Sequence, residues 1–249
     1  MYTVVRQRLI RASLSKTWAC LSDPARLADW FADVDQFGPG QPFRFDFGDG
    51  DFFAGRVIDW QPPDYLVLRW KFMDIGPEFH ITLHASPLLD GGTEMTVVDR
   101  GALSLAEVES LREGWQDFLG RLAQFAGTGT PARYSWSETI GVGALLKQRY
   151  EGYPPRELGD PGWWQTVFPG AEVRRLVGEG GQLLLNFSEN AWDGHRTEAL
   201  IETMPLGSGT YLGVTHRGWA HLPGNQLPER RRYAGYWRSA LESLERRYR

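Results

Sequence analysis

Histidines are the first side chains to consider for chemistry, and the chain has five of them: His80, His84, His195, His216 and His221. A helix would bring His80 and His84 together as a metal-binding pair, but the sequence from Phe79 to Ala85 alternates like a strand. Residues four apart on a strand share a face and are separated by roughly 13 Å, which is too far for both to ligate one ion. We therefore predict no metal site.

Common catalytic and phosphate-binding motifs are also missing from the sequence. It contains no glycine-rich phosphate loop, no Gly-x-Ser-x-Gly elbow and no His-Glu-x-x-His pair. Cys20 falls in a predicted short helix, where a small core residue is more typical than a nucleophile. We predict no cofactor and assign no catalytic residue.

Some polar side chains could still act on a bound ligand. They are Arg44, Asp46, Arg69, Glu78 and His84 in the first half, and Asn186, Trp192, His195, His216 and Arg217 in the second. Arg100 and Arg217 could each orient a carboxylate or a carbonyl group, although an arginine at a strand end more often pairs with a nearby acid. A few such groups would suffice for general acid–base steps on a ligand.

Aromatic residues are abundant, at 13% of the 249 residues, with 11 Trp, 13 Phe and 9 Tyr. They can fill the cores of two domains or line an apolar ligand pocket, where rigid rings give contact area at a low entropic cost. Phe43, Phe45 and Phe47 share one face of a predicted strand. A dry core and a ligand cavity both account for this pattern.

The overall charge limits the kinds of partner. A net charge of -4 gives no basic footprint for nucleic acid, so we predict no nucleic-acid partner; the sequence names no protein partner. One cysteine cannot form an intrachain disulfide, which favours a reducing, cytoplasmic setting. No run approaches 18 apolar residues and Met1 to Ala12 lacks a signal-peptide core, so we predict no membrane association.

An internal repeat organises the chain. Residues 96–101 read Thr-Val-Val-Asp-Arg-Gly and residues 213–218 read Gly-Val-Thr-His-Arg-Gly, so the two Arg-Gly pairs are 117 residues apart (217 minus 100). A strand-like run and a turn precede each pair. An amphipathic helix follows each pair. The apolar stripes of these helices are Trp115, Leu119, Leu122 and Phe125, and Trp237, Leu241, Leu244 and Tyr248.

This duplication predicts two domains, residues 1–128 and 132–249, joined by the Gly/Pro/Thr linker 127–131. The first half reads as a strand (4–10), two short helices, about five strands and a long helix. The predicted five strands are 43–47, 52–60, 65–72, 79–85 and 93–98. The second half keeps the last strands and the helix. We expect a helix over 144–150, a segment over 160–168 that corresponds to Asp23-Pro24 through Trp30-Phe31, and fewer strands.

The first half resembles the AHSA1-like branch of the START/SRPBCC superfamily. The residues that carry the resemblance are Trp18, Leu21-Ser22-Asp23-Pro24, Leu27, Trp30-Phe31, Gly55-Arg56-Val57, Leu68-Arg69-Trp70, Gly114-Trp115, Leu119 and Leu122. It covers residues 1–126 well and 135–249 weakly, through the last strands and Gly235-Tyr236-Trp237. The resemblance implies an α+β fold: two tandem helix-grip domains, each a curved antiparallel sheet around a long C-terminal helix, with the second copy degenerate.

Relatives of this kind include lipid and hormone binders, polyketide aromatases and cyclases, antibiotic resistance proteins and activators of the Hsp90 ATPase. Fold alone does not choose among them. We predict binding, carriage or sequestration of an elongated hydrophobic small molecule, such as a polyketide or polyene. A polyketide cyclase and an Hsp90-activator-like module are the alternatives. Hsp90 activators join this domain to a different N-terminal domain, whereas both halves here look alike.

The resemblance also implies which side chains line the cavity. The predicted ligand-binding residues are Trp30, Phe31, Phe43, Phe45, Phe47, Trp70, Phe72, His84, Trp115, Trp164, Phe187, Trp192 and Trp237.

Overall fold

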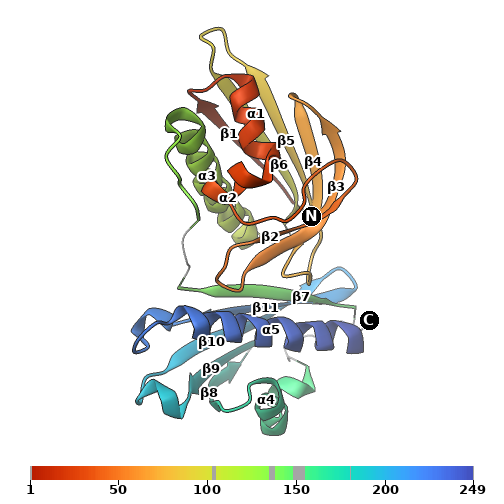
Figure 1. Cartoon of the computed structure of the whole chain (residues 1–249). Coiled ribbons are helices and arrows are strands. Elements are labelled where there is room, and N and C mark those ends of the chain that lie inside the picture. The colour runs from red at the N-terminus through yellow and green to blue at the C-terminus, as the bar shows by residue number, and fades with distance from the viewer. Residues whose placement is uncertain (1, 103–104, 135–137, 148–154, 180, 249) are drawn as a thin grey trace. The chain divides into compact units, whose positions relative to one another are not determined.

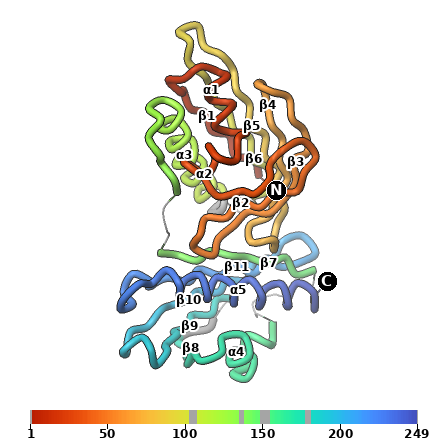
Figure 2. The backbone as a smooth tube through the Cα atoms, in the orientation of Figure 1, coloured from red at the N-terminus to blue at the C-terminus, as the bar shows by residue number. Residues whose placement is uncertain are grey.

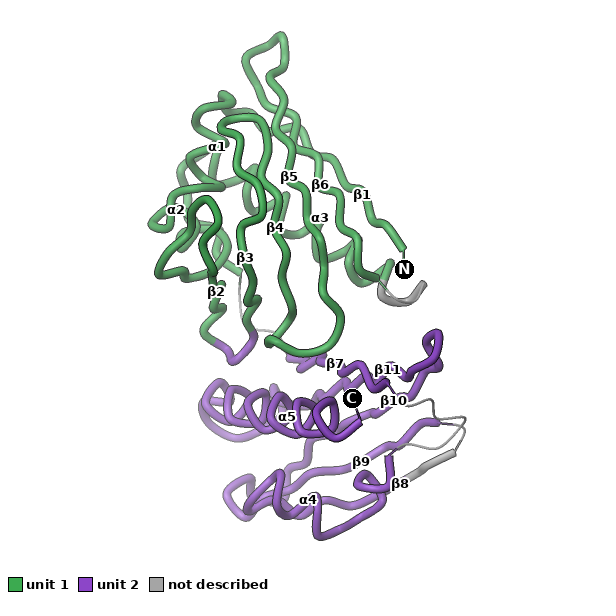
Figure 3. Tube along the Cα trace, turned by 90° about the vertical axis from the view of Figure 1, so that its right-hand side faces the viewer, with its two compact units in different colours: residues 1–48, 52–135 green, residues 49–51, 136–249 purple. Residues whose placement is uncertain are grey.

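Each half of the chain forms one antiparallel sheet with one long helix packed on it (Figure 1). This computed structural model describes residues 2–102, 105–134, 138–147, 155–179 and 181–248. Internal contacts group Met1–Gly48 with Phe52–Ser135 as the first unit, and Asp49–Asp51 with Trp136–Arg249 as the second (Figure 3). The predicted α+β class with two helix-grip halves is confirmed.

The first unit carries a six-stranded sheet in the order β1-β6-β5-β4-β3-β2. Its elements are β1 (Tyr2–Ile10), α1 (Leu14–Ser22), α2 (Pro24–Trp30), β2 (Pro42–Asp46), β3 (Phe52–Gln61), β4 (Tyr65–Phe72), β5 (Phe79–Pro87), β6 (Thr93–Ala102) and α3 (Leu105–Thr128). Helix α3 packs on β1 and β6 and against α1 and α2, as the backbone trace shows (Figure 2). The core lies between the helices and one face of the sheet.

Local sequence signals place these elements. The Ser13 side chain accepts a hydrogen bond from the Lys16 amide and caps α1. Asp23 caps α2 in the same way, and Pro24 occupies its first position. The strands alternate buried and outward residues, as period-two patterns require. Each element predicted for the first half is confirmed to within a few residues at its ends.

Helix α3 buries the predicted stripe. Trp115, Leu119, Leu122 and Phe125 all lie in the core. The helix continues through Thr128, and Gly129 follows it with a φ of 76°, the left-handed conformation that commonly ends a helix. The predicted linker therefore began too early, because its first two residues are helical. The predicted domain limits, 1–128 and 132–249, stay a prediction.

The second unit carries a five-stranded sheet in the order β7-β11-β10-β9-β8, one strand fewer than the first. Its elements are β7 (Ile140–Leu146), η1 (Arg156–Gly159), α4 (Pro161–Val167), β8 (Glu172–Glu179), β9 (Gln182–Ser188), η2 (Asn190–Trp192), β10 (Thr197–Leu206), β11 (Gly209–Arg217), η3 (Trp219–His221) and α5 (Leu227–Arg247). Helix α5 packs on β7 and α4. The described part of this copy thus has fewer strands than the first unit, as expected.

The helix expected over 144–150 is wrong for its first residues. Residues 140–146 form β7, which pairs antiparallel with β11. Ile140, Val142, Ala144 and Leu146 are buried at a period of two, whereas short apolar runs do not by themselves separate strand from helix. Residues 148–150 lie outside the described part of the chain.

Helix α4 repeats the design of α2. Asp160 caps it and Pro161 occupies its first turn, as Asp23 and Pro24 do for α2. In both units the indole N–H of a tryptophan on this helix donates back to a preceding carbonyl: Trp30 to Cys20 at 2.8 Å and Trp164 to Leu158 at 3.1 Å. The predicted correspondence of the two segments is confirmed.

A buried arginine in the second unit forms an ion pair and several hydrogen bonds. Arg230 on α5 is fully buried and donates to both carboxylate oxygens of Asp51, at 2.7 and 3.1 Å. It also donates to the carbonyl oxygens of Asp49 and Thr139, both at 2.8 Å. The three residues Asp49–Asp51, which follow β2 in the chain, belong to this unit.

Candidate functional site

An apolar cavity of about 30 Å³ lies in the first unit between the sheet and the three helices. Its walls are Leu21, Leu27, Trp30, Phe31, Phe37, Phe45, Leu66, Leu68, Trp70, Leu83, Trp115, Phe118, Leu119 and Leu122. Every wall residue is aliphatic or aromatic. Such a surface can contact an apolar molecule but can supply few polar interactions to it.

Aromatic residues make up seven of the fourteen residues of this wall. Phe31 is the centre of one group, and its ring neighbours at centroid separations of 4.8 to 5.3 Å are Trp30, Phe45, Phe47 and Phe118. Trp70 forms a stack with Phe53, at 4.4 Å, and with Trp115, at 5.9 Å. Close ring pairs of this kind add stability beyond the area that they bury.

The cavity is small in this state. A volume of about 30 Å³ suffices for little more than a water molecule, whereas sites for drug-sized ligands measure about 300–1,000 Å³. Most of the aromatic surface predicted to face a ligand is therefore core packing here. Any ligand larger than a few atoms has to displace these rings.

The predicted residues of the first half divide into three groups. Five line the cavity, namely Trp30, Phe31, Phe45, Trp70 and Trp115. Phe43, Phe47 and Phe72 belong to the surrounding ring network, in contact with Phe45, Phe31 and Phe53 respectively. His84 does not belong to either set.

His84 is exposed on β5, on the opposite face from buried Leu83 and Ala85, and its Nδ1 lies 3.2 Å from the Ser86 hydroxyl. His84 is thus not among the residues that line this cavity, and its role as a ligand contact stays a prediction. The alternation of the strand sends residue 84 outward while residues 83 and 85 point inward.

The predicted residues of the second half lie in a different cluster. Trp164, Phe187, Trp192 and Trp237 are all buried in the second unit. They pack with Phe168, His216, Trp219 and Tyr233, at centroid separations from 4.7 to 6.2 Å. None of them lines the 30 Å³ cavity. Their role as ligand contacts stays a prediction.

Sequence reasoning missed a buried carboxyl group next to the cavity. Asp99 on β6 is 2% exposed, and its Oδ2 accepts the indole N–H of Trp115 at 2.7 Å. Its Oδ1 is buried and has no hydrogen-bond partner among the described residues. Burial raises the pKa of Asp99 to about 6, against the opposing effect of the Trp115 hydrogen bond.

The equivalent position in the second unit is His216, which is 117 residues further on and fully buried. Its Nδ1 accepts the indole N–H of Trp237 at 2.8 Å, and its Nε2 lies 2.7 Å from the Thr197 hydroxyl. An indole nitrogen only donates, so the neutral ring carries its proton on Nε2. Burial holds the pKa of His216 well below its ordinary range.

The sequence contains a pattern that could have identified both Asp99 and His216. The aligned repeats place Asp99 and His216 immediately before the two Arg-Gly pairs. On β6, Met95 and Val97 are buried and Asp99 continues the same face. A polar residue at an inward position of an alternating strand is the pattern that marks such a buried group.

The pKa of Asp99 predicts a pH-dependent stability. Its folded-state pKa of about 6 exceeds the ordinary 3.8, so the folded chain keeps a proton that the unfolded chain releases between these values. The stabilisation is complete at acid pH and is lost as pH rises through about 6. At about 1.4 kcal/mol per pKa unit, the free energy of unfolding of the unsubstituted chain should fall by about 3 kcal/mol as pH rises through this range. We expect this fall to be absent in Asp99→Asn. The free energies of unfolding of the variant and of the unsubstituted chain, measured across this pH range, test the prediction. Parallel curves of free energy against pH for the two proteins would contradict it.

His216 predicts a dependence of the opposite sign. The lowered pKa keeps the folded ring neutral, whereas the unfolded ring takes up a proton near its ordinary pKa of 6.5. Its stabilisation is present above that pH and is lost as pH falls below it. We expect His216→Gln to flatten the acid-side loss of stability of the second unit, as followed by hydrogen exchange of its strands. Substitution of the exposed His195 is the control and should leave the loss unchanged.

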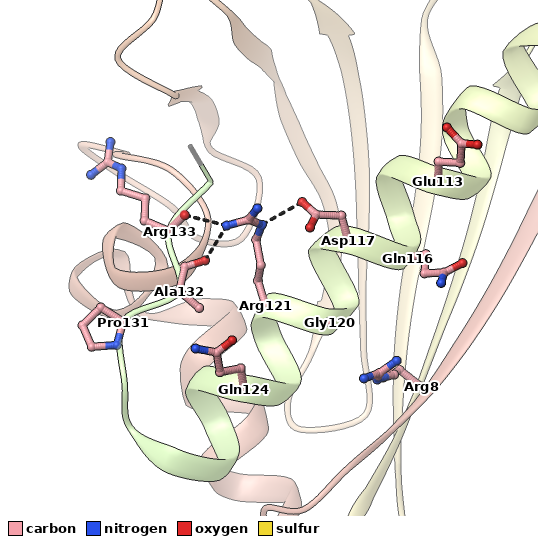
Figure 4. A pocket seen from close by; sticks show the side chains of 10 residues that line it. All are labelled: Arg8, Glu113, Gln116, Asp117, Gly120, Arg121, Gln124, Pro131, Ala132 and Arg133. Atoms are coloured by element: carbon pink, nitrogen blue, oxygen red, sulfur yellow. Dashed lines mark hydrogen bonds and ion pairs between the residues drawn. The ribbon is translucent and has the colours of Figure 1, made fainter. Parts of the chain in front are cut away.

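A larger, polar groove lies on the outer side of α3. It has a volume of about 960 Å³ and is lined by Arg8, Glu113, Gln116, Asp117, Gly120, Arg121, Gln124, Pro131, Ala132 and Arg133 (Figure 4). Arg121 donates to Asp117 at 2.7 Å and to the carbonyl oxygens of Ala132 and Arg133, and Arg133 pairs with Asp33. These internal bonds fix residues 131–133 against α3. We therefore interpret the groove as solvated surface.

The other polar candidates do not converge on one site. Arg217 pairs with Glu198 at 2.7 Å, the ordinary partner of a strand-end arginine, and Arg100 is exposed. Arg44 pairs with Asp46 and Arg69 with Glu78 on exposed surface. Within the residues that the structure describes, no group of three His, Cys, Asp or Glu side chains could hold a metal ion.

Comparison with known families bears on the first unit. Residues 11–127 match the model of the family described as "Activator of Hsp90 ATPase homolog 1-like protein". This segment is similar to that family. The matched range starts just before α1 and ends in the last turn of α3, so it contains every wall of the AHSA1-like cavity.

One solved structure extends the similarity to the second unit. DynU16, a protein in the dynemicin biosynthetic locus, is 28% identical, with a TM-score of 0.88 and coverage of 99% of both chains. CalU16 from Micromonospora echinospora is 21% identical, over 51% of this chain and 77% of its own, with a TM-score of 0.44. Protein MLL2253 from Mesorhizobium loti is 22% identical, over 49% of this chain and 95% of its own, with a TM-score of 0.46.

None of the curated proteins compared with the chain matches it. Among the helices described by the structure, none is long and apolar enough to cross a membrane.

Proposed function

We propose that this chain binds an apolar small molecule in the cavity of its AHSA1-like unit and carries or sequesters it. The observation that supports the proposal is the cavity wall, which consists entirely of aliphatic and aromatic side chains contributed by the helices and the sheet. A ligand in this position would be enclosed by flat ring faces and would bury most of its surface.

The similarity to DynU16 supports a ligand from secondary metabolism. That protein belongs to the dynemicin biosynthetic locus and matches this chain over nearly its full length. We therefore propose an elongated hydrophobic metabolite, polyketide or polyene-like, that is bound during biosynthesis or for self-resistance. An elongated apolar molecule also suits a wall that is rich in aromatic rings.

Binding such a molecule requires the cavity to open. Phe118 lines the cavity but is only partly buried, and its ring contacts Phe47 and Tyr134 at 6.3 and 5.9 Å. Phe47 is also only partly buried. Partly exposed rings have fewer packing partners to lose than buried rings such as Phe31. We propose that the ligand enters beside Phe118 and Phe47.

A ligand panel tests the proposal. The purified chain is titrated with linear polyenes and fused-ring aromatics while tryptophan fluorescence is followed, and each ligand is then recovered for mass analysis. We expect saturable quenching by at least one class, with the ligand recovered unchanged. A panel without any saturable binding would overturn the proposal.

A cyclase-type enzyme is the second candidate, and Asp99 is the observation that favours it. A carboxyl group with a pKa raised to about 6 beside an apolar cavity can take up or release a proton near neutral pH. The same panel separates the two functions. An enzyme would return a ligand of changed mass or a new isomer, and Asp99→Asn would abolish that change while ligand binding persisted.

A further inference from the structure

The starting observation is the unused oxygen of Asp99. Buried polar atoms are almost always paired, and each exception needs an explanation. In Asp99 one carboxylate oxygen accepts the Trp115 indole at 2.7 Å, and the other is buried without a hydrogen-bond partner among the described residues. Its cross-strand neighbours Val4 and Ile81 are apolar and buried.

The Asp99 side chain is separated from the cavity by one side chain, that of Trp115. Trp115, whose N–H is bound by Asp99, also forms part of the cavity wall with its ring. That ring stacks on Trp70, with an interplanar angle of 6°. Asp99 therefore directly contacts a residue of the cavity wall.

The second unit provides an internal comparison. At the equivalent position His216 also accepts an indole N–H, from Trp237, but its other nitrogen is satisfied by the Thr197 hydroxyl. The two units thus share the same link between strand and helix. In this link, the first unit leaves one carboxylate oxygen without a hydrogen-bond partner among the described residues, and the same unit contains the apolar cavity of about 30 Å³.

We propose that Asp99 is the polar anchor of the ligand: its Oδ1 accepts a hydrogen bond from a hydroxyl group of an apolar ligand, while its Oδ2 keeps Trp115 in place. This inference rests on the function proposed above and specifies the ligand class. The molecule is an apolar scaffold that bears a phenol or alcohol at one end.

The chemistry of the surroundings favours a hydroxyl over other donors. None of the described residues that line the cavity carries a charged or hydroxyl-bearing side chain, and burial of an ionised ammonium without further partners is costly. A neutral hydroxyl loses little free energy on leaving water once it donates a hydrogen bond to a carboxylate. A molecule that only accepts hydrogen bonds gains nothing from the ionised Asp99.

A pair of probes tests the anchor in the full chain. The probes are 2-naphthol, which donates a hydrogen bond, and 2-methoxynaphthalene, which has the same rings and only accepts. Their affinities are compared at a pH above the Asp99 pKa of about 6. We expect the unsubstituted chain to prefer 2-naphthol by about tenfold or more, the usual effect of one hydrogen bond to a charged group.

Asp99→Asn separates anchoring from structure. Its amide oxygen can still accept the Trp115 N–H, while its NH₂ group replaces the unused acceptor with a donor. We expect the preference to disappear or reverse in this variant, with the affinity for 2-methoxynaphthalene kept. The matched control is His216→Asn in the second unit, which should leave the preference unchanged. A retained Trp115 indole N–H resonance in Asp99→Asn checks that the ring has kept its position.

The outcomes distinguish the anchor from the function on which it rests. If both probes bind but the preference is absent, or persists in Asp99→Asn, then the anchor is wrong and apolar binding stands. If neither probe binds the unsubstituted chain, then apolar binding in this cavity is overturned and the anchor with it.

Discussion

Replacement of Arg230 by methionine is expected to lower the free energy of unfolding of the second unit by about 3–5 kcal/mol. Arg230 on α5 is fully buried, and it donates two hydrogen bonds to Asp51. The substitution leaves the buried carboxylates without their cation. Burial already raises the pKa of Asp51 to about 6 against the lowering effect of Arg230, so Asp51 should then become protonated and the loss should be smaller at acid pH.

Hydrogen exchange of the strands of the second unit measures this loss. The control is Arg246→Met on the same helix, where an exposed arginine lies 3.6 Å from Glu242; such pairs contribute at most about 1 kcal/mol. An Arg230 variant as stable as the Arg246 variant would show that the buried charges do not depend on each other.

Replacement of Phe31 by alanine is expected to cost the first unit about 3–5 kcal/mol. Phe31 is 4% exposed and contacts four aromatic rings around the cavity. Removal of its ring enlarges the apolar cavity, and an apolar cavity left by such a truncation can bind a small aromatic molecule. We therefore expect this variant to be less stable but to bind benzene or naphthalene more tightly than the unsubstituted chain does.

Chemical denaturation with and without naphthalene measures both effects. Leu9→Ala serves as the control, because this side chain is 64% exposed on β1 and surface changes rarely exceed about 0.5 kcal/mol. If Phe31→Ala lost stability without gaining affinity, then the ring would fill the core without bordering a space that can take a ligand.

The fold could be predicted where local signals were strong. The caps Ser13 and Asp23, the proline after Asp23 and the period-two strands each indicate one structure, and all of them are observed. The repeated Asp-Pro at 160–161 likewise identified α4. Strand β7 was missed because Ile140–Leu146 is short and apolar with two glycines, so its period depends on pairing with β11, which the local sequence does not reveal.

The site was predicted less completely for a physical reason. Aromatic residues stand out in a sequence, and five of those chosen line the cavity. The leucines of the wall, such as Leu66 and Leu83, resemble any other core leucine until the sheet curves around α3. His84 is exposed on the outer face of β5, one residue from the buried Leu83 and Ala85. Asp99 went unnoticed because its significance depends on burial and on the Trp115 indole.

The most direct test of the central claim is to locate the bound ligand through tryptophan indole N–H resonances. Trp30, Trp70 and Trp115 line the cavity, whereas Trp164, Trp192 and Trp237 are buried in the second unit. Individual tryptophan-to-phenylalanine variants assign the signals, and the chain is then titrated with a fused-ring aromatic ligand. Our account predicts that the first three resonances shift with saturation while the other three stay in place. Saturable binding that shifts only the second set, or no shift at any concentration, would contradict it.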